Sequence, residues 1–308
     1  MPAQPSTAVS ITATDGVVLG GRVYEPVSAP RFEVLMLPGV GVPQRAFRHL
    51  ASWLAEHGVR STSVDYRGIG ESRSDPRALE TASMTNWASR DSVGALRFAE
   101  SSAQGRPIVL IGHSFGGQML GFSDEFRRLC AAILVCSQFG QTRHWDGAGR
   151  LKVAAFWHLI LPLAASVFEP VPGWTGIGEA IPRGVAREWA RWGRTHDWLL
   201  PYVAGAAERY AAFDRPLRAY AATDDPIAPP RAVSELLGRF RSTPVERVDL
   251  APADLGLGSI GHLGLLRPGA SERIWREMLD FAERHAGAAN TAEPGSPAWS
   301  SAFSASER

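Results

Sequence analysis

Short apolar runs alternate along the chain with segments in which apolar residues recur at helical spacing. Apolar runs typical of buried strands lie at residues 34–37, 108–111 and 131–136, and further strand-like segments lie at residues 60–64, 217–222 and 245–250. Helical spacing follows at residues 47–54 and 85–101 and after Ser271, and Gly58 is a stop signal for the first of these helices. Ahead of them, residues 8–25 alternate around Asp15-Gly16, which predicts two strands joined by a tight turn. The order predicts an α/β protein whose mostly parallel sheet is covered by helices on both faces.

One block interrupts this alternation. Residues 137–213 have helical patterning broken by prolines and contain six of the ten tryptophans. We interpret this block as a helical cap inserted into an α/β core formed by residues 1–136 and 214–286. Residues 287–308, rich in Ala, Ser, Gly and Pro, are predicted to form a disordered tail.

Composition narrows the class of partner. The 308 residues are 45% hydrophobic and 20% charged, which is typical of a globular protein with a sizeable core. The formal net charge of +1 provides no bulk field toward nucleic acid or an anionic membrane. We therefore expect a small-molecule substrate and no nucleic-acid partner, and leave a homodimer open as the assembly.

Cysteines and apolar segments bear on the cellular compartment. Two cysteines, Cys130 and Cys136, are too few for a disulfide scaffold or a metal knuckle. Residues 1–10 lack the basic start and apolar stretch of a signal peptide. The longest apolar segment, residues 153–168, contains His158 and Pro162 and is shorter than a bilayer span. These features lead us to expect a cytoplasmic protein without stable membrane insertion.

A glycine-flanked serine follows the apolar run at 108–111, in Gly112-His113-Ser114-Phe115-Gly116. A sharp strand-to-helix turn forces its central residue into a strained backbone conformation. Side chains in place of the flanking glycines would collide with the neighbouring strand and helix. Such a turn holds the serine at the sheet edge and at a helix N-terminus, which favours developing negative charge. The context makes Ser114 a candidate nucleophile.

A serine hydroxyl becomes a good nucleophile only beside a base, which in turn needs an orienting acid. His262 is the candidate base, because it lies in a glycine-flanked loop after the strand predicted at 245–250. Asp224 and Asp225 lie just past the strand predicted at 217–222, so either can be the acid. These positions fall at the carboxyl ends of parallel strands, where open α/β sheets place their sites. His113 competes as the base, although packing beneath Ser114 is the favoured interpretation.

These motifs together resemble the α/β-hydrolase superfamily. Within it the chain is most similar to the group of monoacylglycerol lipases and serine aminopeptidases, and to bacterial α/β hydrolases of unassigned substrate. The likeness covers residues 8–137 and 213–285 well and the cap loosely. It depends on Leu37-Pro38-Gly39-Val40, residues 65–72, Gly112-His113-Ser114-Phe115-Gly116-Gly117, Asp225-Pro226 and Gly261-His262.

The resemblance implies a role for each matching residue. Ser114 would be the nucleophile, His262 the general base and Asp225 the orienting acid, in the chain order expected for this fold. The backbone N–H groups of Val40 and Phe115 would form the oxyanion hole. Many relatives carry histidine where this chain has Pro38, a departure that alters the support of the loop but not the backbone donor at Val40. Dehalogenase and epoxide-hydrolase chemistry is disfavoured, because those relatives carry aspartate at the position of Ser114.

The expected reaction is hydrolysis of a carboxylic ester, or a related acyl bond, through an acyl-enzyme. The cap tryptophans are expected to line an apolar substrate pocket, with Trp145, Trp157, Trp189 and Trp192 as the candidates. No cofactor or metal is expected, because no His, Cys, Asp and Glu cluster has metal-ligand spacing. Acyl transfer or carbon–carbon bond hydrolysis by the same triad, and a non-catalytic ligand-binding protein, remain the alternatives.

Overall fold

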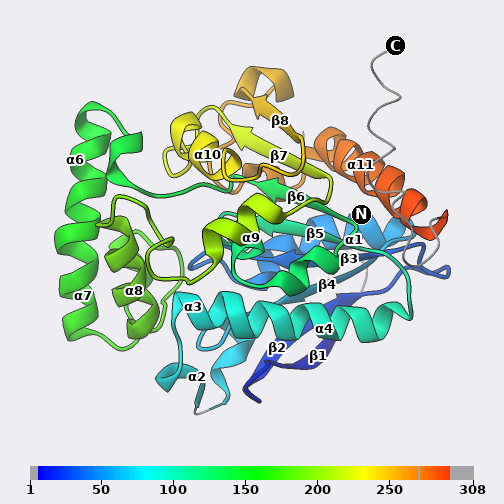
Figure 1. Cartoon of the computed structure of the whole chain (residues 1–308), viewed down its shortest axis with the longest axis horizontal. Helices are drawn as coiled ribbons and strands as arrows, with labels where there is room; N and C mark the ends of the chain where they lie inside the picture. The colour runs from blue at the N-terminus through cyan, green and yellow to red at the C-terminus, as the bar shows by residue number, and fades with distance from the viewer. Residues whose placement is uncertain (1–5, 76, 270, 292–308) are drawn as a thin grey trace.

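A twisted sheet forms the centre of the molecule (Figure 1), and its strands follow the order β1-β2-β4-β3-β5-β6-β7-β8. The computed structural model describes residues 6–75, 77–269 and 271–291. β2 is antiparallel to β1 and β4, and the other neighbouring pairs are parallel. The strands are β1 (Ser6–Thr12), β2 (Val18–Tyr24), β3 (Glu33–Leu37), β4 (Arg60–Val64), β5 (Ile108–His113), β6 (Ala131–Val135), β7 (Leu217–Ala222) and β8 (Val245–Leu250). The predicted α/β class and mostly parallel sheet are confirmed.

Helices cover both faces of this sheet. The helices of the core are α1 (Arg48–Glu56), α2 (Arg77–Glu80), α3 (Met84–Asn86), α4 (Ser92–Ala103), α5 (Phe115–Gln118), α10 (Pro230–Leu237) and α11 (Ser271–Thr291). α1 and α11 pack together on one face, where the rings of Trp53 and Trp275 lie 6.0 Å apart. α4 crosses the other face (Figure 1). The central strands β3, β5 and β6 are buried along their whole length, because helices cover them on both sides.

The carboxyl-terminal helix is longer than the sequence predicted. We expected a disordered tail from residue 287, but α11 continues to Thr291. Gly287 does not end it, because Ala286, Ala288 and Ala289 around it have the highest helix propensity. The remainder of the predicted tail, residues 292–308, lies outside the described residues.

The segment between β6 and β7 contains α6 (Gly147–Ala155), α7 (Leu161–Val167), α8 (Arg183–Gly193) and α9 (Ala206–Ala212). A π-helical turn at Phe156–Ile160 joins α6 to α7. α6, α7 and α8 stand together beyond the end of the sheet (Figure 1). Gly193 permits close packing here, since a Cβ atom on it would lie 2.2 Å from the Trp157 ring.

The joined helix Gly147–Val167 is largely uncovered by the rest of the chain. Leu151, Leu159, Leu163 and Val167 follow one another at multiples of four residues and are all exposed. Within the described residues, this is the one helix long and apolar enough to cross a bilayer by length and composition, and 22% of its most apolar 18-residue stretch is buried. The apolar segment identified from the sequence, residues 153–168, is shorter than this helix, because the helix begins at Gly147.

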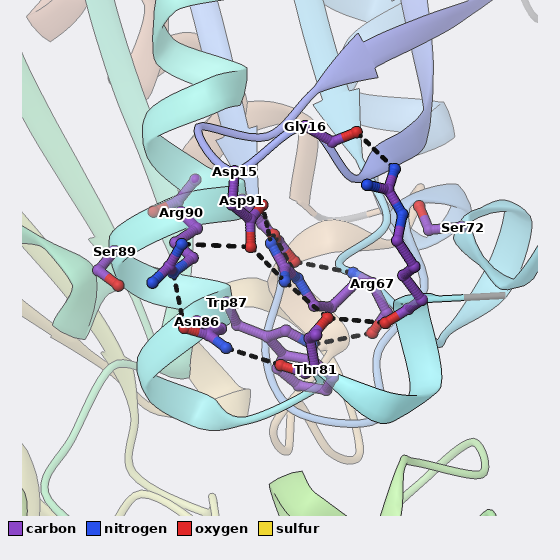
Figure 2. A network of polar contacts seen from close by, with 12 residues as sticks. Asp15, Gly16, Arg67, Ser72, Thr81, Asn86, Trp87, Ser89, Arg90 and Asp91 are labelled. Carbon is purple, nitrogen blue, oxygen red and sulfur yellow. Dashed lines mark hydrogen bonds and ion pairs between the residues drawn. The ribbon is translucent and has the colours of Figure 1, made fainter. Parts of the chain in front are cut away.

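A buried ion cluster fixes the loop after β4 (Figure 2). Arg67 is fully buried, and its guanidinium binds Asp91 at 2.8 Å and both carboxylate oxygens of Asp15 at 2.7 and 2.8 Å. Trp87 donates its indole N–H to the carbonyl of Arg67 at 2.9 Å. Burial raises the pKa of Asp91 to about 6, although Arg67 opposes this shift. The cluster ties the β1–β2 turn, the loop at residues 65–72 and the helical segment before α4 to one another.

Candidate active site

Ser114 occupies the turn between β5 and α5, with φ of 52° and ψ of −116°. This left-handed backbone conformation is strained for a residue with a side chain. Neighbouring glycines make the turn sterically feasible. A Cβ atom on Gly112 would lie 2.6 Å from the Gly117 nitrogen, and one on Gly116 would lie 1.9 Å from the Leu37 carbonyl oxygen. The local sequence therefore forms the sharp strand-to-helix turn that the motif predicted.

Ser114 is held between the sheet and the loop that follows β3. Its backbone N–H donates to the carbonyl of Val135 on β6 at 2.9 Å. Gly39 approaches from the other side so closely that a Cβ atom on it would lie 3.3 Å from the Ser114 Oγ. Only 8% of Ser114 is exposed, and the residue lines a cavity beneath the cap.

Asp225 and His262 meet at the carboxyl end of the sheet. The distance between His262 Nδ1 and Asp225 Oδ2 is 2.6 Å, a strong hydrogen bond. Asp225 Oδ1 accepts from the backbone N–H groups of Ile227 and Ala228 at 2.8 and 3.1 Å. Burial raises the pKa of the Asp225 carboxyl, but the bond from His262 and these amides outweigh it, so its pKa lies below the ordinary value. The carboxylate stays ionised and holds the imidazole through Nδ1.

Asp224, the rival for the acid role, points to a different set of partners. It accepts hydrogen bonds from the Ser259 hydroxyl at 2.8 Å and from the backbone N–H groups of Ile260 and Gly261 at 2.9 and 3.1 Å. These three residues directly precede His262. Asp224 thus fixes the loop that carries the imidazole, while Asp225 binds the imidazole itself.

His113 lies beneath this arrangement instead of acting in it. Its ring is fully buried, and Nε2 donates to the carbonyl of His262 at 2.8 Å. The ring centroids of His113 and His262 are 4.8 Å apart. Burial, reinforced by the neighbouring His262, lowers the pKa of His113 to about 3. A neutral, buried His113 therefore supports the His262 backbone directly beside Ser114.

The expected oxyanion donors lie at the same edge of the cavity. Val40 and Phe115 both line it together with Ser114. Phe115 is the first residue of α5, so its N–H has no acceptor within that helix. The Val40 N–H donates to no protein group among the described residues. Both amides are thus available to a substrate oxygen.

The cavity has a volume of about 300 Å³ and is mostly apolar. Trp145, Trp157 and Trp189, three of the four candidate tryptophans, line it. Trp198 also lines it, and its indole N–H donates to Gln118 Oε1 at 2.9 Å. The remaining lining residues are Val40, Ser114, Phe115, Gln118, Gln138, Gly140, Lys152, Val153, Phe156, Ile160, Gly176, Pro226 and Ile227.

Trp192 does not line this cavity, which corrects the expectation from the sequence. It is fully buried beneath the lining, with its ring about 6 Å from those of Phe115, Phe122 and Trp198. Residues 189 and 192 lie one helical turn apart on α8, but Trp192 is turned further toward the core. Sequence spacing placed both on one side of the helix and could not separate lining from core.

Cys136 lies beside the two charged members of the site. Its sulfur and ligand atoms of Asp225 and His262 all lie within 4.8 Å of one another. Burial raises the pKa of the Cys136 thiol well above its ordinary value. Asp225 and His262 already bind each other at 2.6 Å, which occupies one potential ligand atom of each residue. The group therefore fits a hydrogen-bonded support for Asp225 better than a metal centre.

The chain belongs to the alpha/beta hydrolase family, whose sequence model matches residues 34–273. A curated relative, the polyketide transferase grgF of Penicillium sp., is 32% identical over 141 residues, which cover 45% of this chain and 47% of the relative. The chain thus matches about half the length of this curated relative.

Three solved structures illustrate the likeness in fold. The alpha/beta hydrolase GrgF from Penicillium sp. sh18 superposes with a TM-score of 0.58 and 23% identity, over 92% of this chain and 99% of that one. The complex of DcsB with its substrate analogue gives a TM-score of 0.63 and 18% identity, over 92% and 100%. A thermophilic esterase from Thermogutta terrifontis gives 0.61 and 17%, over 91% and 99%. At these identities the likeness concerns the fold.

Proposed function

We propose that this protein is a serine hydrolase that cleaves a carboxylic ester, or a related acyl bond, of a small and largely apolar substrate. The observation that carries the proposal is the 2.6 Å bond between His262 and Asp225, at the sheet edge where the strained turn presents Ser114. The mostly apolar cavity that Ser114 lines supports an acyl or aromatic group as the bound portion.

The chemistry follows the acyl-enzyme route. His262 Nε2 takes the proton from Ser114 Oγ, and Oγ attacks the ester carbonyl carbon. The backbone N–H groups of Val40 and Phe115 donate to the oxyanion that forms. His262 then returns the proton to the departing alcohol, leaving the acyl group on Ser114. Water, deprotonated by His262, attacks this acyl-enzyme. His262 then returns the proton to Ser114 Oγ as the acid is released.

Asp225 contributes to these reaction steps by remaining negatively charged. The depressed pKa of its carboxyl keeps it ionised at neutral pH, so it stabilises the imidazolium formed when His262 accepts a proton. It also fixes the tautomer in which His262 Nε2 is the acceptor.

Acyl transfer is the second candidate, and the curated relative favours it. That relative is named a polyketide transferase. The first half of the mechanism is the same for both reactions, and an acceptor other than water would take the acyl group from Ser114. Carbon–carbon bond hydrolysis would use the same residues, whereas a ligand-binding protein would use the cavity alone.

Labelling with a fluorophosphonate probe and hydrolysis of 4-nitrophenyl butanoate test the proposal. Ser114→Ala should abolish labelling and lower kcat by roughly 10⁴-fold or more, since the nucleophile is lost. Ser137→Ala is the matched control, because that buried serine contacts the Gly112 carbonyl and does not line the cavity. Retained labelling of Ser114→Ala refutes the assignment. A folded wild-type protein that never labels favours ligand binding.

The same ester separates hydrolysis from acyl transfer. Acyl products are quantified with and without an added alcohol acceptor. Acyl transfer is indicated when the ratio of transferred ester to free acid exceeds the molar ratio of alcohol acceptor to water. Free acid as the only product indicates hydrolysis.

A further inference from the structure

One lysine is among the residues that line the candidate cavity, and this residue is exposed to solvent. Lys152 on α6 is the only charged residue among the described residues that form its wall. It is also the only lysine in a chain with 32 basic residues. The other 31 of these residues are arginines, and none of those that the structure describes lines this cavity.

No described residue neutralises this charge. Lys152 forms no ion pair or side-chain hydrogen bond within the described part of the chain. The joined helix Gly147–Val167 contains no aspartate or glutamate. Carboxylates of the cap are engaged elsewhere: Asp146 pairs with Arg231 at 3.0 Å, and Glu188 binds Thr85 at 2.6 and 2.9 Å.

A single cation on an otherwise apolar cavity wall favours substrates that carry a negative charge. The apolar surroundings lower the local dielectric and strengthen its attraction for an anion, while the exposed side of the lysine is screened by water and salt. An ammonium group forms charge-assisted hydrogen bonds with a carboxylate. A substrate that spans the cavity from Ser114 to Lys152 would place its ester at one residue and a negative group at the other.

We propose that Lys152 forms an anion subsite, and that the preferred substrates are esters carrying a carboxylate at a distance from the scissile bond. The proposal rests on the ester hydrolysis proposed above. The carboxylate can belong to the acyl part or to the alcohol part of the ester, and both present the same group to the lysine.

Two matched pairs of esters test the subsite. Mono-4-nitrophenyl adipate is compared with 4-nitrophenyl hexanoate, which places the charge on the acyl part. The butanoate ester of 4-hydroxybenzoic acid is compared with that of its methyl ester, which places the charge on the alcohol part. The measured quantity is the ratio of kcat/KM for the charged ester to that for its neutral partner.

Lys152→Met should lower this ratio by roughly 5–30-fold in one of the two pairs. Dividing by kcat/KM for the neutral ester cancels any effect of the substitution on the shape of the cavity wall. The affected pair identifies the part of the ester that carries the anion. Lys152→Glu should lower the ratio further, and added salt should reduce the ratio of the wild type. Arg150→Met is the control, because Arg150 is an exposed cation on the same helix outside the cavity wall.

Unchanged ratios in both pairs for Lys152→Met overturn the subsite, as does an equal change in Arg150→Met. Failure of the underlying reaction has a different signature. In that case wild-type protein would hydrolyse none of the four esters, or Ser114→Ala would hydrolyse them equally well. The neutral esters also verify that each lysine variant is folded.

Discussion

His113 donates its Nε2 hydrogen to the backbone carbonyl of His262 at 2.8 Å, although 149 residues separate them in the chain. The bond links the strand-to-helix turn that presents Ser114 to the loop that carries the proposed base. His113 must remain neutral in the folded protein, since burial lowers its pKa to about 3. The relationship explains why the residue next to the proposed nucleophile is a histidine without a proton-transfer role.

The first prediction concerns acid stability. His113 has an ordinary pKa of 6.5 in the unfolded chain and about 3 in the folded protein. Between these values the unfolded state binds a proton that the folded state does not. The full contribution of His113 to the free energy of unfolding is therefore present above pH 6.5. Below that pH the contribution decreases by about 1.4 kcal/mol per pH unit.

Urea unfolding of wild type and His113→Gln between neutral pH and pH 5 measures this effect. The difference in unfolding free energy between the two proteins should shrink as the pH falls, because glutamine does not titrate. A difference that is constant with pH contradicts the neutral, buried His113.

The second prediction separates the two adjacent aspartates. Asp225→Asn should lower kcat by roughly 10³–10⁴-fold, because the amide cannot stabilise the imidazolium and favours the wrong tautomer. Asp224→Asn disturbs the loop before His262 without touching the imidazole, so we expect a loss of about tenfold and a lower Tm.

Steady-state kinetics and thermal unfolding of both variants decide between these roles. The Asp225 variant should retain a Tm near that of the wild type, which shows that its loss is chemical. If Asp224→Asn lowers kcat as much as Asp225→Asn does, the assignment of Asp225 to the imidazole and Asp224 to the loop is wrong.

Backbone requirements made part of the site predictable from the sequence. The turn at Ser114 needs glycine at 112 and 116, because a Cβ atom there would enter the neighbouring backbone. That requirement makes the glycine-flanked serine recognisable as a motif in the sequence. Asp224 and Asp225 are different, since adjacent residues after a strand point in different directions. Which one reaches His262 depends on where the loop at 259–262 lies, and only the folded chain specifies it.

Periodicity predicted the strands and the long helices α1, α4 and α11 of the core, but not α10, and it could not assign burial within the cap. The alternating and apolar runs correspond to strands because each strand of the sheet has a fixed environment on its two faces. In the cap, Trp189 and Trp192 have the same chemical character, and the packing of α8 alone decides which one lines the cavity. The end of α11 was misplaced because one glycine within an alanine-rich stretch does not outweigh helix propensity.

The third prediction concerns the buried ion cluster of Figure 2. Arg67→Met leaves the buried carboxylate of Asp91 without its main partner, so the variant should lose about 3–5 kcal/mol of stability. Arg22→Met is the control, because it removes a partly exposed ion pair with Glu71 and should cost less than about 1 kcal/mol.

Urea unfolding at neutral pH compares the two variants. Equal losses for Arg67→Met and Arg22→Met would show that the buried cluster does not hold the loop at residues 65–72 in place.

The last prediction uses the two tryptophans of α8 to test which surface receives the substrate. Trp189 lines the cavity, so Trp189→Ala enlarges it. The variant should raise kcat/KM for 4-nitrophenyl decanoate relative to the butanoate by roughly 3–10-fold, because each added methylene contributes only a small free energy in an apolar pocket. Trp192 is fully buried away from the wall, so Trp192→Ala removes core packing and should lower stability by about 3–5 kcal/mol with no gain in chain-length preference. Kinetics with both esters and unfolding of both variants measure the two effects. A shift in chain-length preference in Trp192→Ala but not in Trp189→Ala would mean that the acyl chain binds on the other side of α8.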